Sequence, residues 1–177
     1  MTSNQMAQST PDGVEDPTVY NGCFEVEVVI NRPVEAVWKQ FLDMTAWITT
    51  YDMKVISGVP NTVGSVTRLS PKNAKDADVP PAPYHFTKIV KLVPNQQYVI
   101  KTFSAKIGSY GGIFATGFDD ARFLSMGDKT KVIWNLYSEM KADIVAKDPA
   151  FMKTLFAGSR DGMAENFKNL KRIMESR

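Results

Sequence analysis

The sequence predicts an α+β fold in which a strongly bent antiparallel sheet wraps around one long C-terminal helix. Three observations support this prediction. An alternating strand leads into an amphipathic helix, about ninety β-rich residues follow with no helix between their strands, and a long helical stripe ends the chain. The expected order is therefore one strand, two helices, six strands and a final helix, with the strands joined as an antiparallel meander.

The first strand and the first helix are predicted from two different periods. Residues 23–30 alternate between apolar and polar positions, which indicates a strand with one buried face. Pro33 suits a first helical turn because its φ is fixed near the helical value. An apolar stripe with helical spacing follows it, made of Val34, Val37, Trp38, Phe41 and Leu42. Residues 44–51 are expected to form a second short helix that carries Trp47, Ile48 and Tyr51.

The middle of the chain predicts strands that are separated by turn residues. They are expected near 53–58, 64–70, 84–93, 96–105, 113–124 and 130–141. The proline-rich segment 71–83 is longer than a hairpin needs, so we expect a mobile loop there. In the final helix, Asp148 suits the N-cap and Pro149 the first helical position.

Composition limits the classes of function. The chain has 177 residues, with 21 Lys and Arg against 19 Asp and Glu, and shows no long run of like charge. No nucleic-acid partner is therefore expected. Residues 1–20 are polar and predict a disordered tail before one domain at 21–177, and no apolar stretch is long enough for a membrane span. The expected location is cytoplasmic, and the sequence leaves open whether the protein forms a homodimer.

Metal and nucleotide chemistry is not expected. Cys23 is the single cysteine and His85 the single histidine, so no cysteine or histidine cluster for zinc can form. The glycine-rich segment 106–112 lacks the Gly-Lys-Ser/Thr pattern of a phosphate loop. We therefore expect no cofactor, and a flexible lid at 106–112.

Four segments together resemble the START-like superfamily, also called SRPBCC or Bet v 1-like. They are FEVEVVINRPVEAVWKQFLDMTAWITTY (24–51), VPNTVGSVTRL (59–69), GDKTKVIWNLYSEM (127–140) and MAENFKNLKRIMES (163–176). The resemblance covers about residues 22–175 and implies a helix-grip fold with a deep cavity between sheet and long helix. Members of this superfamily hold lipids, sterols, polyketides or other aromatic molecules, and include cyclases, plant carriers, lyases and chaperone activators. The resemblance therefore implies a cavity and does not imply one reaction.

Aromatic and polar side chains near the expected cavity are candidate ligand contacts, because small-molecule sites are mostly apolar with a few polar groups. Ordinary core packing is the alternative for each aromatic residue. The candidates are Trp47, Tyr51, Arg68, Tyr84, Phe86, Phe103, Tyr110, Phe118, Trp134, Glu139 and Ser159. Arg68 and Glu139 are included because a charge inside an apolar cavity would orient a polar ligand end.

The candidate catalytic residues are Tyr51, His85 and Asp119. Asp119 and Asp120 are adjacent on one expected strand, so their side chains should point to opposite faces. We expect one of them in solvent. The other would be buried against a cation such as Arg122 or Arg68, or would enter the cavity with a raised pKa.

Gly158 and Gly162 lie inside the expected long helix, where a glycine costs roughly 1 kcal/mol relative to alanine. Close packing of helix on sheet and space for a ligand both remain open as explanations.

The resemblance is compatible with two functions that use a bound ligand, an enzyme as the first hypothesis and a carrier as its alternative. One is a cofactor-independent cyclase, dehydratase, isomerase or lyase acting on an apolar or aromatic small molecule, and the other is a carrier or sensor of a hydrophobic ligand. A chaperone-activator-like interaction module is a third hypothesis, against which a large enclosed cavity would argue. Titratable groups converging on that cavity would favour catalysis.

Overall fold

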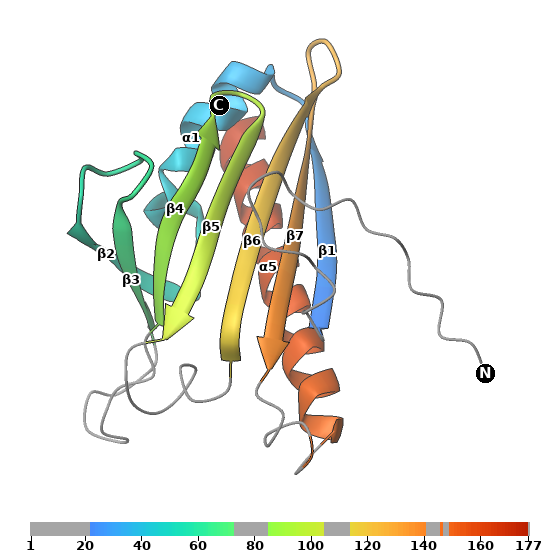
Figure 1. Cartoon of the computed structure of the whole chain (residues 1–177). Helices are drawn as coiled ribbons and strands as arrows, with labels where there is room; N and C mark the ends of the chain where they lie inside the picture. The colour runs from blue at the N-terminus through green and yellow to red at the C-terminus, as the bar shows by residue number, and fades with distance from the viewer. Residues whose placement is uncertain (1–21, 73–84, 105–113, 141–145, 147–148, 177) are drawn as a thin grey trace.

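The computed structural model describes residues 22–72, 85–104, 114–140, 146 and 149–176 (Figure 1). Its strands form one antiparallel sheet in the order β1-β7-β6-β5-β4-β3-β2. The elements are β1 Gly22–Ile30, α1 Val34–Leu42, α2 Met44–Trp47, β2 Tyr51–Ser57, β3 Val66–Pro71, β4 His85–Val93, β5 Gln97–Ser104, β6 Phe114–Ser125, β7 Thr130–Met140 and α5 Pro149–Glu175. The predicted fold class and element order are confirmed.

The second helix is shorter than predicted. It ends at Trp47, and Ile48 already has extended backbone angles, φ −80° and ψ 112°. The β-branched run of Ile48, Thr49 and Thr50 favours extended backbone over helix. Tyr51 is therefore the first residue of β2 and does not lie on a helix. The expected tail at 1–20, the lid at 106–112, Asp148 and nearly all of the loop at 71–83 lie outside the described residues.

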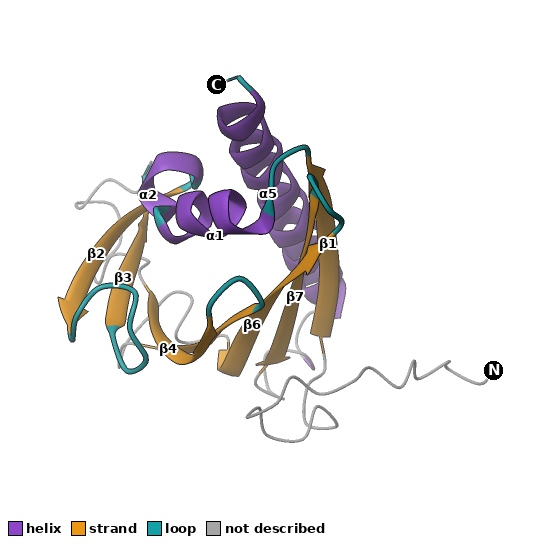
Figure 2. Cartoon of the chain, turned by 90° about the horizontal axis from the view of Figure 1, so that it is seen from above, coloured by secondary structure: helices purple, strands orange, loops and turns teal. Residues whose placement is uncertain are grey.

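The sheet curves around α5, while α1 and α2 cross one end of the curve (Figure 2). Register shifts interrupt three strand pairs, at Val55/Ser57, Ile89/Lys91 and Phe114/Thr116. Such bulges add local twist and bend a strand, which helps an antiparallel sheet to curl. The sheet therefore encloses the helix on one side, and its concave face carries every second residue of each strand.

Aromatic side chains fill the end of the curve beneath α1 and α2. Phe41 and Trp47 are fully buried, with their ring centroids 5.3 Å apart. Phe167 of α5 is also buried, 5.9 Å from the ring of Trp47 and 6.4 Å from that of Trp134 on β7. Helices and sheet thus share one aromatic core, which fixes where α5 crosses the sheet.

Hydrogen bonds hold the C-terminal half of α5 in the same place. Asn169 Nδ2 donates to the carbonyl oxygen of Trp47 at 2.9 Å, and the backbone N–H of Thr49 donates to Asn166 Oδ1 at 3.1 Å. Glu175 Oε1 accepts the backbone N–H of Asn31 at 2.8 Å. These bonds tie α5 to the end of α2, to Thr49 after it and to Asn31 after β1, so this end of the molecule is closed.

Replacing Phe167 should test the aromatic core. We expect Phe167→Ala to lower the free energy of unfolding by about 3–5 kcal/mol, because the change leaves a cavity between Trp47 and Trp134. Urea denaturation measures this loss. The neighbouring exposed position gives a matched control, and Lys168→Ala should change stability by no more than about 0.5 kcal/mol. Equal effects of the two substitutions would contradict the assignment of Phe167 to the core.

Candidate functional site

A cavity of about 640 Å³ lies between the concave face of the sheet, α5 and the segment around α2. Most of its wall is apolar, in keeping with small-molecule sites. Apolar lining residues are Leu42, Met44, Ile48, Met53, Val55, Leu69, Ile89, Ile100, Leu136, Leu155, Phe156 and Met163. The aromatic core occupies one end of the space inside the sheet, and the cavity occupies the remainder.

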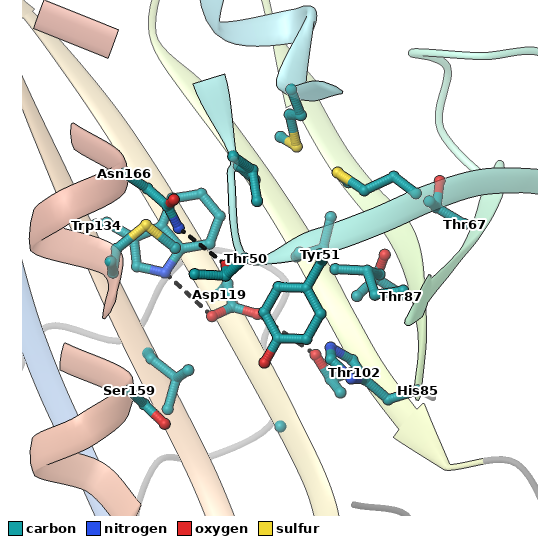
Figure 3. A pocket seen from close by; sticks show the side chains of 18 of the residues that line it. Thr50, Tyr51, Thr67, His85, Thr87, Thr102, Asp119, Trp134, Ser159 and Asn166 are labelled. Atoms are coloured by element: carbon teal, nitrogen blue, oxygen red, sulfur yellow. Dashed lines mark hydrogen bonds between the residues drawn. The ribbon is translucent and has the colours of Figure 1, made fainter. Parts of the chain in front are cut away.

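Polar groups interrupt this wall from several strands and from α5 (Figure 3). They include Thr50, Tyr51, Ser65, Thr67, His85, Thr87, Thr102, Asp119, Ser138, Ser159 and Asn166. Those on the strands follow the two-residue alternation of the pleat, so that Thr87 shares its face with His85, and Thr102 shares its face with Tyr98. The cavity therefore offers hydroxyl, amide, imidazole and carboxyl groups to a ligand.

Asp119 is the acidic group at the centre of this view (Figure 3). Its Oδ1 accepts a hydrogen bond from Trp134 Nε1 at 3.1 Å, and its Oδ2 accepts one from Thr102 Oγ1 at 3.4 Å. Burial raises the pKa of its carboxyl to about 7, although the two hydrogen bonds act in the opposite direction. Loss of hydration therefore outweighs the two donors. The result is a carboxyl group that exchanges its proton near neutral pH.

Burial and the neighbouring Asp119 also change the pKa of Tyr98. Its side chain lines the cavity and is 5% exposed. Burial raises the pKa of its hydroxyl, and the nearby negative charge of Asp119 raises it further. Tyr98 therefore keeps its proton at neutral pH and can serve only as a hydroxyl group.

Asp120 corrects one expectation. Its side chain points to the opposite face from Asp119, as alternation predicts, but neither carboxylate lies in solvent: Asp119 is 7% exposed and Asp120 is fully buried. Arg122 Nε and Gln97 Nε2 donate to the two oxygens of Asp120 at 2.8 and 2.9 Å. Charge-assisted hydrogen bonds thus compensate the burial of Asp120, whereas the hydrogen bonds of Asp119 among the described residues come from the neutral donors Trp134 and Thr102.

His85 and Tyr51 meet on another part of the wall. Their rings are edge-to-face, with centroids 5.4 Å apart and planes at 87°. Burial lowers the pKa of His85 to about 4, so the imidazole is neutral at physiological pH. The two catalytic candidates are thus neighbours across β2 and β4, which β3 separates.

The structure brings together part of the predicted ligand-contact set. Tyr51, Trp134 and Ser159 line the cavity, as do His85 and Asp119. Phe118 borders the cavity, yet alternation with Asp119 turns its side chain to the outer face, where Lys101 Nζ lies 5.2 Å from the ring centroid. Trp47 belongs to the core, and its indole N–H donates to the carbonyl oxygen of Phe41 at 2.9 Å.

Other predicted contacts lie away from the cavity. Arg68 is exposed and pairs in register with Phe86, and neither residue lines the cavity. Glu139 is half-buried and is also absent from the wall. Tyr84, Tyr110 and the side chain of Phe103 are outside the described part of the chain.

Sequence reasoning missed several polar wall residues. Thr87 and Thr102 could not be singled out because threonine is common on any strand. Asn166 could not be singled out because an asparagine in a helix is usually a solvent-exposed polar position. Asn166 is in fact 3% exposed, and its amide Nδ2 donates to Thr50 Oγ1 at 3.4 Å. Alternation along β3 is the one sequence signal that could have found some of them. Thr67 and Leu69 share the cavity face of this strand, and Arg68 between them must point to the other face.

Gly158 and Gly162 both face open space. Each lines the cavity, and a Cβ atom added to either would meet no described atom within 4 Å. The two glycines are thus not needed for close packing of α5 on the sheet. They enlarge the cavity, which is the second of the two explanations that the sequence left open.

Within the described segments, no group of three or more His, Cys, Asp or Glu side chains is arranged to hold a metal ion. No helix in those segments has the length and apolar character needed to cross a membrane.

Comparison with known proteins identifies the fold. No protein-family model and no curated protein sequence matches this chain. Solved structures do match. The di-domain aromatase/cyclase StfQ from the steffimycin pathway matches with a TM-score of 0.69 at 13% identity, over 91% of this chain and 53% of that one. Norcoclaurine synthase from Thalictrum flavum matches with a TM-score of 0.63 at 11% identity, over 88% and 94%.

A third match is Ara h 8.0201, with a TM-score of 0.62 at 15% identity over 88% of this chain and 99% of that one. These structures share the Bet v 1-like helix-grip arrangement of a seven-stranded antiparallel sheet, two short helices and a long C-terminal helix. The helix-grip fold that the sequence resemblance implied is confirmed.

The two buried cavity groups should change the pH dependence of stability in opposite directions. With the pKa of Asp119 raised from 3.8 to about 7, the folded chain holds the extra proton and loses stability as pH rises through that range. With the pKa of His85 lowered from 6.5 to about 4, the folded chain loses stability as pH falls through that range. The two effects oppose each other wherever the ranges overlap.

Single substitutions should separate them. Relative to the wild type, Asp119→Asn should become more stable as pH rises from about 4.5 to 7, at roughly 1.4 kcal/mol per unit of pKa shift removed. His85→Gln should become more stable relative to the wild type as pH falls from about 6.5 to 4.5. Urea midpoints at several pH values measure both trends. Parallel curves for all three proteins would show that these groups titrate normally.

Filling the space beside Gly162 should block the cavity. We expect Gly162→Leu to weaken binding of the neutral fluorescent probe N-phenyl-1-naphthylamine at least tenfold without lowering the melting temperature, because leucine is the better helix former. Ala157→Leu is the matched control on an exposed face of α5 and should bind the probe like the wild type. Equal probe affinity in all three proteins would place the probe elsewhere.

Proposed function

We propose that this protein binds a small, largely apolar molecule in the cavity and catalyses cofactor-independent proton transfer on it, with Asp119 as acid or base. The observation that carries the proposal is the carboxyl group of Asp119, which is buried, lines the cavity and has a pKa of about 7. A general acid or base works best when its pKa lies near the working pH. Burial of the carboxyl group is the main cause of that raised pKa.

The neighbours of Asp119 suit this role. Trp134 and Thr102 each donate to one carboxylate oxygen and so fix the orientation of the group. Such fixed geometry is what makes a proton-transfer residue effective on a bound substrate. His85, with a pKa of about 4, is too weak a base to remove protons efficiently at neutral pH. We therefore assign it, with Tyr51, to substrate orientation.

The reaction class follows from this chemistry. Cyclases, dehydratases, isomerases and lyases without cofactors share one step, in which a positioned group moves a proton on an activated carbon or oxygen. An aromatase/cyclase and a synthase are among the solved structures with this fold, which supports the class and leaves the substrate open. Fold alone does not define a reaction, so the assignment depends on Asp119.

A carrier is the second candidate. The mostly apolar wall favours it, because such a wall holds a hydrophobic ligand without any chemistry. The cavity itself argues against a chaperone-activator-like module, which would need no interior space.

The Kemp elimination tests the catalytic proposal directly. In 5-nitrobenzisoxazole a base removes the proton on C3, the C–H electron pair forms the nitrile, and the N–O bond breaks to give a coloured phenolate. We expect turnover that rises as pH passes about 7, since the ionised form of Asp119 is the base. Asp119→Asn should reduce this rate roughly 100-fold or more.

Asp52→Asn is the control, since it removes an exposed carboxylate from β2. It should keep the wild-type rate. A wild-type rate no greater than that of Asp119→Asn, with N-phenyl-1-naphthylamine still bound, would overturn catalysis and leave the carrier function.

A further inference from the structure

The described wall of the cavity has acidic side chains but no permanently cationic ones. This part of the wall contains no lysine or arginine. The ionisable lining residues are Asp43 beside α2, Tyr51 on β2, His85 on β4, Tyr98 on β5 and Asp119 on β6. The part of α5 that lines the cavity contributes no ionisable side chain. At neutral pH, the described wall of the cavity is therefore neutral or negative.

The described cations near Asp119 are on the other side of the sheet. Lys101 lies over the outer-face ring of Phe118, and Arg122 is paired with Asp120. The sheet itself thus separates these cations from the cavity face. A carboxylate inside an apolar wall is strongly disfavoured unless it is paired and hydrogen-bonded.

Asp119 also retains unused hydrogen-bonding capacity. An ionised carboxylate offers about four acceptor sites on its two oxygens. In the described structure, one site on each oxygen is occupied, by Trp134 on Oδ1 and by Thr102 on Oδ2. A ligand with N–H donors could fill the remaining sites, whereas a ligand carboxylate would be repelled.

We propose that the cavity selects a ligand with an apolar body and a protonated primary or secondary amine, whose N–H groups bind the carboxylate of Asp119. This inference builds on the ligand-binding function proposed above and names its substrate class. The ammonium supplies a positive charge where the described wall has no lysine or arginine, and its N–H donors complete the hydrogen bonds of both oxygens. The apolar body fills the space that Gly158 and Gly162 leave.

A matched set of naphthalene probes tests the inference. The probes are 2-(1-naphthyl)ethylamine, 2-(1-naphthyl)ethanol and 1-naphthylacetate, which share a ring and differ in the charge of the end group. Isothermal titration calorimetry near pH 8 should show the amine binding at least tenfold more tightly than the alcohol, and the carboxylate most weakly. Asp119→Asn should remove the preference for the amine while the affinity for the alcohol changes less than twofold. Asp52→Asn should keep the wild-type order.

A pH series on the wild type gives a second test that needs no substitution. The probe amine stays protonated between about pH 5 and 8, so any change in its preference reports the protein. The advantage of the amine over the alcohol should shrink toward pH 5, where Asp119 is neutral. Equal binding of amine and alcohol near pH 8, or an amine preference that survives in Asp119→Asn, would overturn the inference and leave ligand binding intact. Failure of all three probes to bind would overturn ligand binding as well.

Discussion

The indole of Trp134 contacts both the aromatic core and the cavity. Its ring packs 6.4 Å from Phe167 in the aromatic core, while its N–H donates to the carboxylate of Asp119 in the cavity. Trp134 therefore lies at the boundary between the core and the cavity. Because the core holds Trp134 in place, the orientation of Asp119 depends on the packing of α5 against the sheet.

That packing also explains why the cavity survives in a folded protein. Phe41, Trp47 and Phe167 are buried in one aromatic cluster that joins the helices to Trp134 of the sheet at one end. Asn166 and Asn169 then fix α5 to the end of α2 and the residues after it by hydrogen bonds to Thr49 and Trp47. Nearer its N-terminus, α5 lines the cavity with Gly158 and Gly162, whose missing side chains leave space beside the sheet. Asn166 serves both purposes, because its side chain holds Thr49 and also lines the cavity.

The sequence predicted the fold well because the fold depends on patterns. Alternation located the strands, and a helical stripe located α5, whatever the exact side chains. The prediction that the second helix continues past Trp47 was wrong, because a run of β-branched residues outweighed a short apolar pattern. Local signals of that kind decide only a few residues, so the element order was unaffected.

The site was less predictable because it depends on neighbours across the sheet. Alternation separates Asp119 from Asp120 but does not say which of them faces the helix. Nor does it reveal that Gln97 and Arg122 cover Asp120 on the outer face, since that contact needs the register of β5 with β6. Asp119 could be named as a candidate, whereas the placement of Lys101 and Arg122 on the opposite face required the assembled sheet.

The two glycines of α5 affect how the size of the cavity can change in evolution. Each gives up roughly 1 kcal/mol of helix stability for empty volume. A Cβ atom at Gly158 or Gly162 meets no described atom within 4 Å, so a good helix former such as alanine or leucine there would reduce the volume while restoring helix propensity. Ligand size is then adjustable by single codon changes to such residues that selection for stability would not oppose. A lineage built on this scaffold can diversify its ligands while its fold stays constant.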